Sequence, residues 1–368
     1  MARIVRYPPP HRNISTEGAV ELATMATSTA SSSSSSIPTK APALSLLDLV
    51  PARRNDSPQQ PFVNAVELAQ AAERSGYETM YYAEHHNMGE IASTATAVLM
   101  GHVAARTETL GVGAAGVMLT NHAPLVVAEQ FKMLEALYPG RIQLGLGRAP
   151  GTDQATVRAL RRSPDAAEHF PSDVMELLGY LDGPSRIPGV EAYPATPDST
   201  IPVTILGSSL YGAQLAAKLG LPYSFASHFA PTHLHEAIKV YREEFKPSER
   251  LDKPRVTVAA GVVAAPTASE ANDQFQIALR RRVQSMLGRN RSQPFTDAEI
   301  DQILQMPAGN QVRNMMSYSA VGTPDRVVEQ LRQMAEETQA DELILSHHAI
   351  SHEDRLASVI STGEAWSK

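Results

Sequence analysis

The sequence predicts an α/β protein built as a closed (β/α)8 TIM barrel with insertions, preceded by a disordered N-terminal tail. From residue 43 onward, short apolar segments typical of buried strands alternate with longer segments of helical periodicity. The alternation repeats through eight strands. Repeated βα units of this length form a parallel sheet, and eight strands can close into a barrel. An open doubly wound sheet is the alternative fold.

The predicted strands span residues 43–50, 79–84, 110–119, 141–147, 201–206, 223–226, 255–264 and 341–346. The predicted helices span residues 62–75, 92–105, 125–137, 211–219, 232–245, 269–287 and 352–360. Two connections, 151–200 and 289–321, are longer than ordinary loops. We expect these connections to carry extra helices or lids and to determine substrate specificity.

Residues 1–43 differ from the rest of the chain. They contain Pro8-Pro9-Pro10 and an uninterrupted serine run at 31–36, with few periodic apolar residues. Such a segment buries too little apolar surface to offset its chain entropy, so we expect disorder. The stretch 25–47 has no acidic residue and also suits an organelle transit peptide, while a start at Met25 is the other interpretation. The predicted domains are a 1–43 extension and a 44–368 barrel.

The composition excludes several classes of protein. The 368 residues include no cysteine, so disulfides, thiolate nucleophiles and cysteine-ligated metals are ruled out. A net charge of −7 argues against partners such as nucleic acid or an anionic membrane surface. No apolar run reaches the roughly 18 residues that a membrane span requires. We therefore expect a cytoplasmic protein that acts on a small molecule.

The segment Glu84-His85-His86 ends the second predicted strand. Neighbouring residues of a strand point to opposite faces, so at most one of the two imidazoles faces a shared opening. A pair of hydrogen-bonded structural histidines is the alternative. Barrels keep their chemistry at the C-terminal ends of their strands, an opening that we call the mouth, so the position favours a functional role.

A second candidate site combines Arg148 with Ser208 and Ser209. Arg148 follows the fourth strand, and the two serines lie between the fifth strand and a helix. A helix start presents free N–H groups that attract anions, and a guanidinium suits phosphate or carboxylate. The alternatives are an ion pair between Arg148 and Asp153, and simple capping of the helix by either serine.

Histidines after later strands could reach the same mouth. His228 follows the sixth strand, and His347-His348 follow the eighth. A metal bound by His85, His86, His228 and His347 would make the protein a metal-dependent barrel hydrolase. We expect no metal, because the first strand has no His-x-His and the fourth offers no liganding lysine or histidine.

The chain resembles the bacterial luciferase-like flavin-dependent monooxygenases, most closely their compact single-chain members. The resemblance runs from about residue 44 to the C-terminus. It includes Ala83-Glu84-His85-His86 and Gly147-Arg148-Ala149-Pro150-Gly151. The matching segments, in chain order, are residues 46–48, 83–88, 116–124, 128–130, 138–142, 145–153, 206–209, 226–231 and 321–324.

The resemblance implies an oxidoreductase, a flavoprotein that binds reduced FMN. It implies that oxygen is activated as a C4a-peroxyflavin and that a small apolar or aldehyde-like substrate is oxygenated. His85 is implied as the catalytic acid or base, a role that the near-neutral pKa of imidazole allows. Ala115–Gly116 matches the family's non-proline cis peptide under the flavin ring. The implied cofactor-binding residues are Asp48, Glu84, Ala115, Gly116, Arg148, Ser208, Ser209 and Gly212. The implied substrate-pocket residues are His86, His228 and His347.

Two departures from the family pattern matter. Gly147 stands where luciferase itself carries a reactive cysteine, so we do not expect light emission, and Thr120 stands where many relatives have proline. Members of the wider family use a deazaflavin to transfer hydride without oxygen, and others appear as flavin carriers without turnover; both are alternatives. We expect a separate reductase to supply the reduced flavin. A homodimer is expected from the family and from the frequency of twofold symmetry.

Overall fold

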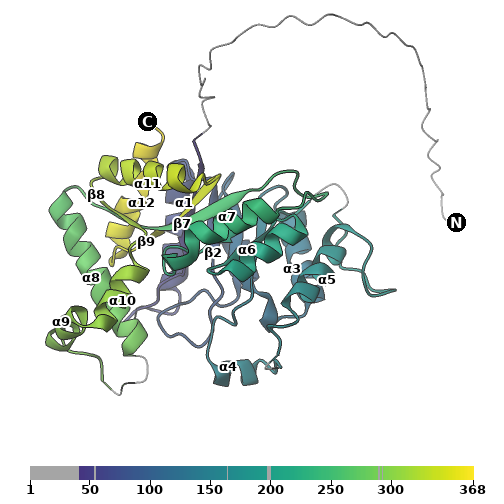
Figure 1. The fold of residues 1–368 in the computed structure, drawn as a ribbon, viewed down its shortest axis with the longest axis horizontal. Helices are drawn as coiled ribbons and strands as arrows, with labels where there is room; N and C mark the ends of the chain where they lie inside the picture. The colour runs from purple at the N-terminus through teal and green to yellow at the C-terminus, as the bar shows by residue number, and fades with distance from the viewer. Residues whose placement is uncertain (1–40, 54, 164, 197–199, 289–290, 292) are drawn as a thin grey trace, which may run out of the picture. The chain divides into compact units, whose positions relative to one another are not determined.

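The computed structural model describes residues 41–368 apart from residues 54, 164, 197–199, 289–290 and 292 (Figure 1). The predicted N-terminal tail therefore lies, up to residue 40, outside the described residues. The first strand begins at Ala43. Among the residues described, no helix has both the length and the apolar character needed to cross a bilayer.

Eight parallel strands close into a barrel. Each pairs with the next in the order β1-β2-β3-β4-β5-β6-β7-β9, and β9 pairs with β1. The prediction of a (β/α)8 barrel is confirmed, and the open doubly wound sheet is wrong. The barrel strands are β1 (Ala43–Asp48), β2 (Thr79–Tyr82), β3 (Gly111–Met118), β4 (Ile142–Gly147), β5 (Val203–Gly207), β6 (Tyr223–Phe225), β7 (Val256–Ala264) and β9 (Glu342–His347).

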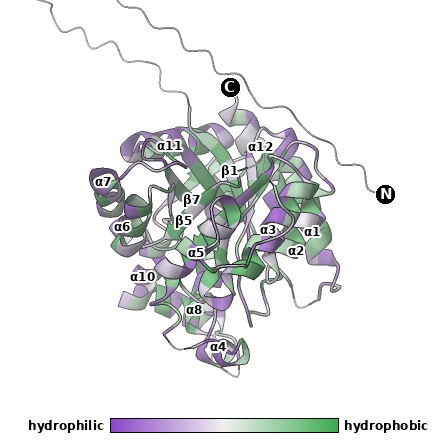
Figure 2. Ribbon diagram, turned by 90° about the vertical axis from the view of Figure 1, so that its right-hand side faces the viewer, coloured by the Kyte–Doolittle hydropathy of each residue, from purple (hydrophilic) through white to green (hydrophobic). Residues whose placement is uncertain are grey.

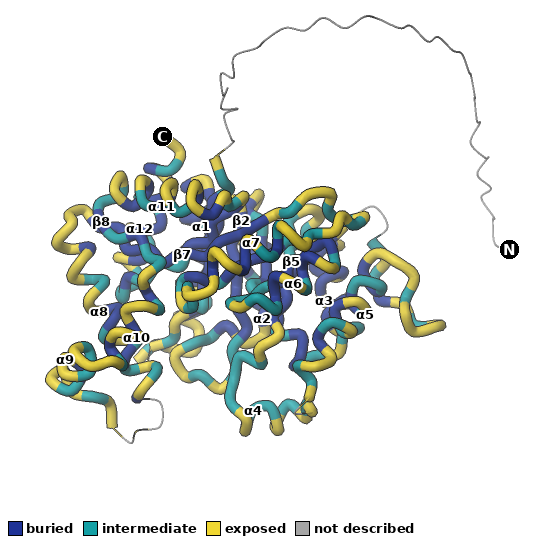
Figure 3. Tube along the Cα trace, viewed as in Figure 1, coloured by how far each residue is buried: buried dark blue, intermediate teal, exposed yellow. Residues whose placement is uncertain are grey.

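Helices surround the barrel and cover its strands with their apolar sides. In the first of them, Ala65, Leu68, Ala69 and Ala72 recur with helical spacing and are buried. Figure 3 shows the same division, with buried residues along the strands and exposed residues on the outer helix faces. The surrounding helices are α1 (Gln60–Arg74), α2 (Thr96–Ala104), α3 (Pro124–Leu137), α6 (Leu210–Leu219), α7 (Leu234–Glu244), α11 (Pro324–Thr338) and α12 (His352–Trp366).

The two long connections carry helices, as expected. Residues 151–200 contain α4 (Gln154–Ala159) and α5 (Phe170–Asp182). After β7, α8 (Ala268–Leu287), α9 (Asp297–Gln305) and α10 (Pro307–Met315) form a group with its own small apolar core, visible on the left of Figure 1. Short 3-10 turns at Leu119–Asn121 and Pro231–His233 complete the fold.

The sequence analysis missed two elements between residues 319 and 338. β8 (Ser319–Gly322) is a ninth strand that pairs with the C-terminal part of β7, beyond the residues that pair with β6. The helix α11 follows it directly. Together with α8–α10, these elements separate β7 from β9 along the chain while the two strands stay adjacent in the barrel.

The barrel interior is filled by side chains. Near the N-terminal ends of the strands, Ser45 Oγ donates to Glu342 Oε1 (2.7 Å), and Gln143 Nε2 donates to Thr79 Oγ1 (2.8 Å). Above this polar layer lies an apolar layer that includes Leu47 and Ile344. The overview in Figure 2 likewise places apolar residues along the central strands.

Strands β3 and β4 approach each other unusually closely near the mouth. The Ala115–Gly116 peptide is cis, as expected, and the register of β3 on β4 shifts between Ala114 and Val117. A Cβ placed on Gly145 would lie 2.4 Å from the carbonyl oxygen of Ala114 and 2.9 Å from Leu206 Cδ1. Glycine at position 145 is what lets the two backbones meet at this distance.

We expect Gly145→Ala to lower the free energy of unfolding by about 1–3 kcal/mol, the usual loss when a packed interior is overfilled. The new Cβ would collide with backbone, which cannot move aside as a flexible side chain can. Urea denaturation measures the effect. Gly183→Ala is the control, because a Cβ at that position meets nothing within 4 Å. Equal stabilities for the two variants would contradict this account of the close approach.

Candidate functional site at the mouth of the barrel

The three polar residues that follow β2 lie on two sides of the chain. Glu84 and His86 share one side, and His86 Nε2 donates to Glu84 Oε1 (2.8 Å). His85 lies on the other side. This arrangement agrees with the expectation that the two imidazoles point in different directions, and His86 is the one bonded to Glu84.

Glu84 is a buried carboxylate with four hydrogen-bond donors around it. Besides His86, two side chains from the turn after β3 donate hydrogen bonds to Glu84. They are Asn121, through Nδ2 at 3.2 Å, and His122, through Nε2 at 2.9 Å. The backbone N–H of Met118 donates at 3.1 Å. Burial alone would raise the pKa of Glu84, but the bonds from His122, His86 and Asn121 outweigh it and hold the pKa below its usual value. Glu84 is therefore ionised at neutral pH and joins the ends of β2 and β3.

Sequence reasoning did not single out Asn121 or His122. Their residue types are common in loops, and only the fold brings them to a carboxylate far back in the sequence. Glu84, His86 and His122 could also ligate a metal ion, because each offers one ligand atom and these atoms lie within 4.8 Å of one another. However, the four donors already occupy the acceptor sites of the carboxylate, so the cluster is satisfied without an ion.

His85 has an unsatisfied buried nitrogen. Its Nδ1 has no hydrogen-bond partner among the described residues, while its backbone N–H donates to the carbonyl of Ser93 (3.0 Å). Burial lowers the pKa of the imidazole, and the Glu84 carboxylate opposes that shift only in part. His85 is thus neutral at pH 7 and can accept a proton from a group bound in the mouth.

Arg148 follows β4, and its side chain lies beside the start of α6. Its guanidinium stacks on the ring of Tyr211, 4.0 Å from the ring centroid, in the first turn of that helix. Asp153, the partner considered for Arg148, caps α4 by accepting from the backbone N–H of Thr156 (2.9 Å). The structure therefore keeps the Arg148 side chain beside the helix start.

The N-terminal end of α6 lacks a side-chain cap. Ser209 occupies the N-cap position, but its hydroxyl makes no capping bond, so the capping alternative is not realised for this residue. Ser208 precedes it, and Gly212 is buried against β5 and Tyr223. A cavity of about 510 Å³ beside this helix start is lined by Arg148, Ala149, Pro150, Ala167, Glu168 and Tyr211.

Asp48 is paired within the protein. Its Oδ1 accepts from Arg355 Nη1 of α12 (2.7 Å) and from the backbone N–H of Val50 (2.9 Å). The second oxygen, Oδ2, is buried and has no partner among the described residues. The structure therefore gives Asp48 a role in fixing α12 to the end of β1. It leaves one oxygen atom for a ligand.

The structure places His347 away from the mouth. His347 Nδ1 hydrogen-bonds with Ser358 Oγ of α12 (2.7 Å), and its Nε2 lies 3.4 Å from the hydroxyl of Tyr77. The substrate-pocket position predicted for His347 needs correction, because alternation along β9 turns this residue outward and the next one inward. His348 is the residue whose charge acts on His228. The set His85, His86, His228 and His347 is not brought together.

Burial keeps three histidines neutral. It lowers the pKa of His228 and His347 to about 3 and that of His348 to about 4, and nearby positive charges add to the shifts. Above pH 6.5 neither the folded nor the unfolded chain protonates these residues appreciably. Below it, only the unfolded chain does so until the folded pKa is reached.

Stability should therefore fall as the pH drops below about 6.5, by up to about 1.4 kcal/mol per pH unit for each such histidine. We expect His347→Gln to reduce this slope, measured as the urea unfolding free energy at several pH values. His169→Gln is the control, since that side chain is 63% exposed. An unchanged slope for His347→Gln would show that this imidazole is protonated in the folded state.

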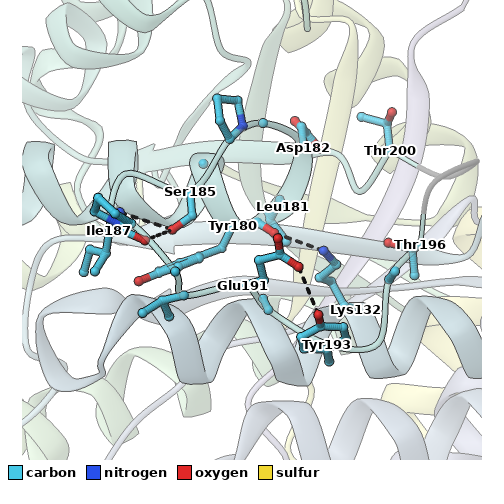
Figure 4. A pocket seen from close by; sticks show the side chains of 18 residues that line it. Lys132, Tyr180, Leu181, Asp182, Ser185, Ile187, Glu191, Tyr193, Thr196 and Thr200 are labelled. Carbon is cyan, nitrogen blue, oxygen red and sulfur yellow. Dashed lines mark hydrogen bonds between the residues drawn. The ribbon is translucent and has the colours of Figure 1, made fainter.

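A different cavity, of about 500 Å³, lies away from the mouth (Figure 4). It is formed by the end of α5, the segment that leads toward β5, and Lys132 of α3, whose ammonium donates to the carbonyl of Tyr180 (3.1 Å). The segment reaches the N-terminal end of β5, whereas the mouth lies at the C-terminal ends. None of the predicted site residues lines this cavity.

Comparison with known proteins gives a consistent result. The profile of the family described as luciferase-like monooxygenase matches residues 44–342. A protein of Escherichia coli strain K12 named luciferase-like monooxygenase is 45% identical over 317 residues, which cover 86% of this chain and 94% of that protein. An N-acetyl-S-alkylcysteine monooxygenase of Bacillus subtilis is 35% identical over 235 residues, covering 62% of this chain and 69% of the relative.

Solved structures share the fold. The crystal structure of apo-MsnO8 superimposes with a TM-score of 0.78 and 33% identity, covering 89% of this chain and 98% of that one. Two more distant structures carry different cofactors. A 3,6-diketocamphane monooxygenase component from Pseudomonas putida in complex with FMN is 16% identical with a TM-score of 0.65, covering 88% of this chain and 97% of that one. An F420-dependent secondary alcohol dehydrogenase is 14% identical with a TM-score of 0.65, covering 89% and 99%.

Proposed function

The chain belongs to the luciferase-like monooxygenase family, and we propose that it uses reduced FMN and molecular oxygen to oxygenate a small organic substrate at the mouth of its barrel. Membership makes the protein a flavin-dependent enzyme. The observation that carries the proposal is the pairing of two features at one opening. These are an anion site formed by Arg148 and the start of α6, and a neutral, unpaired imidazole at His85.

The residues at the mouth fit FMN. The phosphate would accept hydrogen bonds from the free N–H groups of α6, from Arg148, and from the hydroxyls of Ser208 and Ser209. The flat ring would lie over the Ala115–Gly116 peptide, at the point where β3 shifts register. When bound, reduced flavin supplies the electrons that activate oxygen. The protein's part is to bind the ring, exclude water and handle protons.

His85 is the residue that we assign to proton transfer. Its neutral state at pH 7 suits acceptance of a proton, and the hydrogen bond that its backbone N–H donates to the carbonyl of Ser93 fixes its backbone. Glu84 contributes indirectly, because its bonds to His86 and His122 hold the end of β2 in place. The substrate-pocket role predicted for His228 is kept in this proposal, whereas the bond of His86 to Glu84 gives His86 a positioning role instead.

FMN is preferred over a deazaflavin for one reason. Relatives at 45% and 35% identity are named monooxygenases, whereas an F420-dependent glucose-6-phosphate dehydrogenase is 29% identical over only 42% of this chain. An aldehyde or another small apolar compound remains the proposed substrate class, and the sulfur compound in the name of the Bacillus subtilis relative adds thioethers to the panel. A separate reductase and a homodimeric state belong to the proposal. Reduction of FMN by NAD(P)H with the purified protein alone, or a monomer by light scattering, would contradict those two parts.

We expect His85→Ala to reduce substrate-dependent oxygen uptake by roughly 10²–10⁴, as is typical for a lost acid or base, and to leave FMN binding within several-fold. In the wild type, uptake should fall as the pH drops through the lowered pKa of His85, because the protonated ring can no longer accept a proton. Oxygen consumption with reduced FMN and a panel of aldehydes and thioethers is the measurement. His235→Ala, on the exposed face of α7, is the control. Full activity in His85→Ala would remove His85 from the chemistry.

We expect Arg148→Ala to weaken FMN binding by roughly 1.5–3 kcal/mol, the usual contribution of a hydrogen bond to a charged group. Quenching of FMN fluorescence gives the dissociation constant. Arg158→Ala is the matched control, since this arginine lies on α4 and contacts its own helix. Identical FMN affinities for the two variants would place the phosphate elsewhere.

A further inference from the structure

A second positively charged group lies on α8, which follows β7, and so is separated in strand order from the Arg148 cavity. Arg282 belongs to α8, which packs against β7 and β8. Its charge acts on His228, which follows β6, and on His348, which follows β9. The Arg148 site, by contrast, lies at the ends of β4 and β5.

Arg282 has no carboxylate partner among the described residues. Burial alone lowers its pKa, with no opposing contribution from a nearby acid. Two residues earlier on the same helix, Arg280 pairs with both Asp297 and Asp301. Another partly buried arginine, Arg250, pairs with Asp182. A partly buried guanidinium without an anion is unfavourable, so the position calls for an explanation.

Three polar side chains with an unpartnered atom lie on β8 or follow β6 and β9. His228 Nδ1, His348 Nε2 and Ser319 Oγ are all buried and have no hydrogen-bond partner among the described residues. Two of them converge on Gly261 of β7. A Cβ at that position would lie 2.3 Å from Ser319 Oγ and 2.5 Å from His348 Nε2. The absent side chain at Gly261 leaves the imidazole and the hydroxyl side by side at the end of the strand.

We propose that Arg282, His228 and His348 form a subsite that binds the carboxylate of an organic-acid substrate. A guanidinium fork matches a carboxylate with two parallel hydrogen bonds, and neutral imidazoles add N–H donors. A bound carboxylate would give the unpartnered histidine nitrogens a hydrogen-bond partner and would also neutralise the charge of Arg282. This inference rests on the proposed function, because the carboxylate would anchor a substrate whose other end reaches the flavin.

The test is calorimetric titration of the FMN-loaded protein with straight-chain carboxylates from acetate to decanoate, each compared with its methyl ester. We expect at least one carboxylate to bind and its uncharged ester to bind roughly 10–100-fold more weakly, the ratio that a charge-assisted hydrogen bond gives. Arg282→Gln should weaken the carboxylate by the same factor, while Arg282→Lys should retain part of the affinity. Arg281→Gln is the matched control, because Arg281 is exposed on the same helix.

Each other outcome overturns the inference. No carboxylate binding, equal binding of acid and ester, or equal affinity in Arg282→Gln and the wild type would remove the subsite. A loss of FMN affinity in Arg282→Gln as large as that in Arg148→Ala would assign Arg282 to the cofactor instead. Failure of the proposed function is recognised separately, since it would appear as absent FMN binding in the wild-type protein before any carboxylate is added.

Discussion

Glu84 brings a negative charge into the interior at the point where β2 meets the mouth, and the arrangement of the other site residues depends on it. The carboxylate is only 2% exposed and accepts from His86, Asn121, His122 and the backbone of Met118. A buried charge with this many donors is stable, whereas one deprived of them would not be. The backbone N–H of Glu84 also donates to the carbonyl of Gly116 (3.2 Å), which ties the cluster to the cis peptide.

The same cluster explains the environment of His85. Because His86 is bonded to Glu84, the alternation of the strand end turns His85 to the other side, where its Nδ1 is buried and unpaired. Three further imidazole nitrogens, of His228, His348 and His352, are left in the same condition. Natural proteins satisfy most buried polar groups, so the unpartnered nitrogens of His85, His228 and His348 are the atoms that we propose for contact with a ligand. The positively charged groups Arg148 and Arg282 then favour anionic ligands.

Much of this fold is readable from the sequence because buried parallel strands are continuous apolar runs, and eight of them were identified. The missed β8 is short, with only Ala320 and Val321 as apolar residues between Ser319 and Gly322, so it has no distinct pattern. The missed α11 did carry a signal: Pro324 at its first position and buried Val327, Val328 and Leu331 at helical spacing.

The site was less readable than the fold, for physical reasons. His347 and His348 are neighbours at the end of a strand, so they point to opposite faces. An error of one residue in the predicted register exchanges the two. His122 gains its role through a contact with Glu84, which follows the neighbouring strand, and no local pattern predicts this contact. Arg282 belongs to the run Arg280-Arg281-Arg282, and only the packing of α8 decides which of the three is withdrawn from water. Local motifs therefore give only the predictions for the phosphate site and His85, while the contacts of His122, His347 and Arg282 required the tertiary structure.

The central claim is that reduced FMN binds at this mouth and that the protein controls its reaction with oxygen. The most direct measurement is an anaerobic titration of the purified protein with reduced FMN, followed by mixing with air in a stopped-flow absorbance instrument. We expect saturable binding and, after mixing, a transient spectrum at the violet edge of the visible range before oxidised FMN appears. Reoxidation at the rate of free FMN without any transient, or tight deazaflavin binding with no FMN binding, would contradict the account.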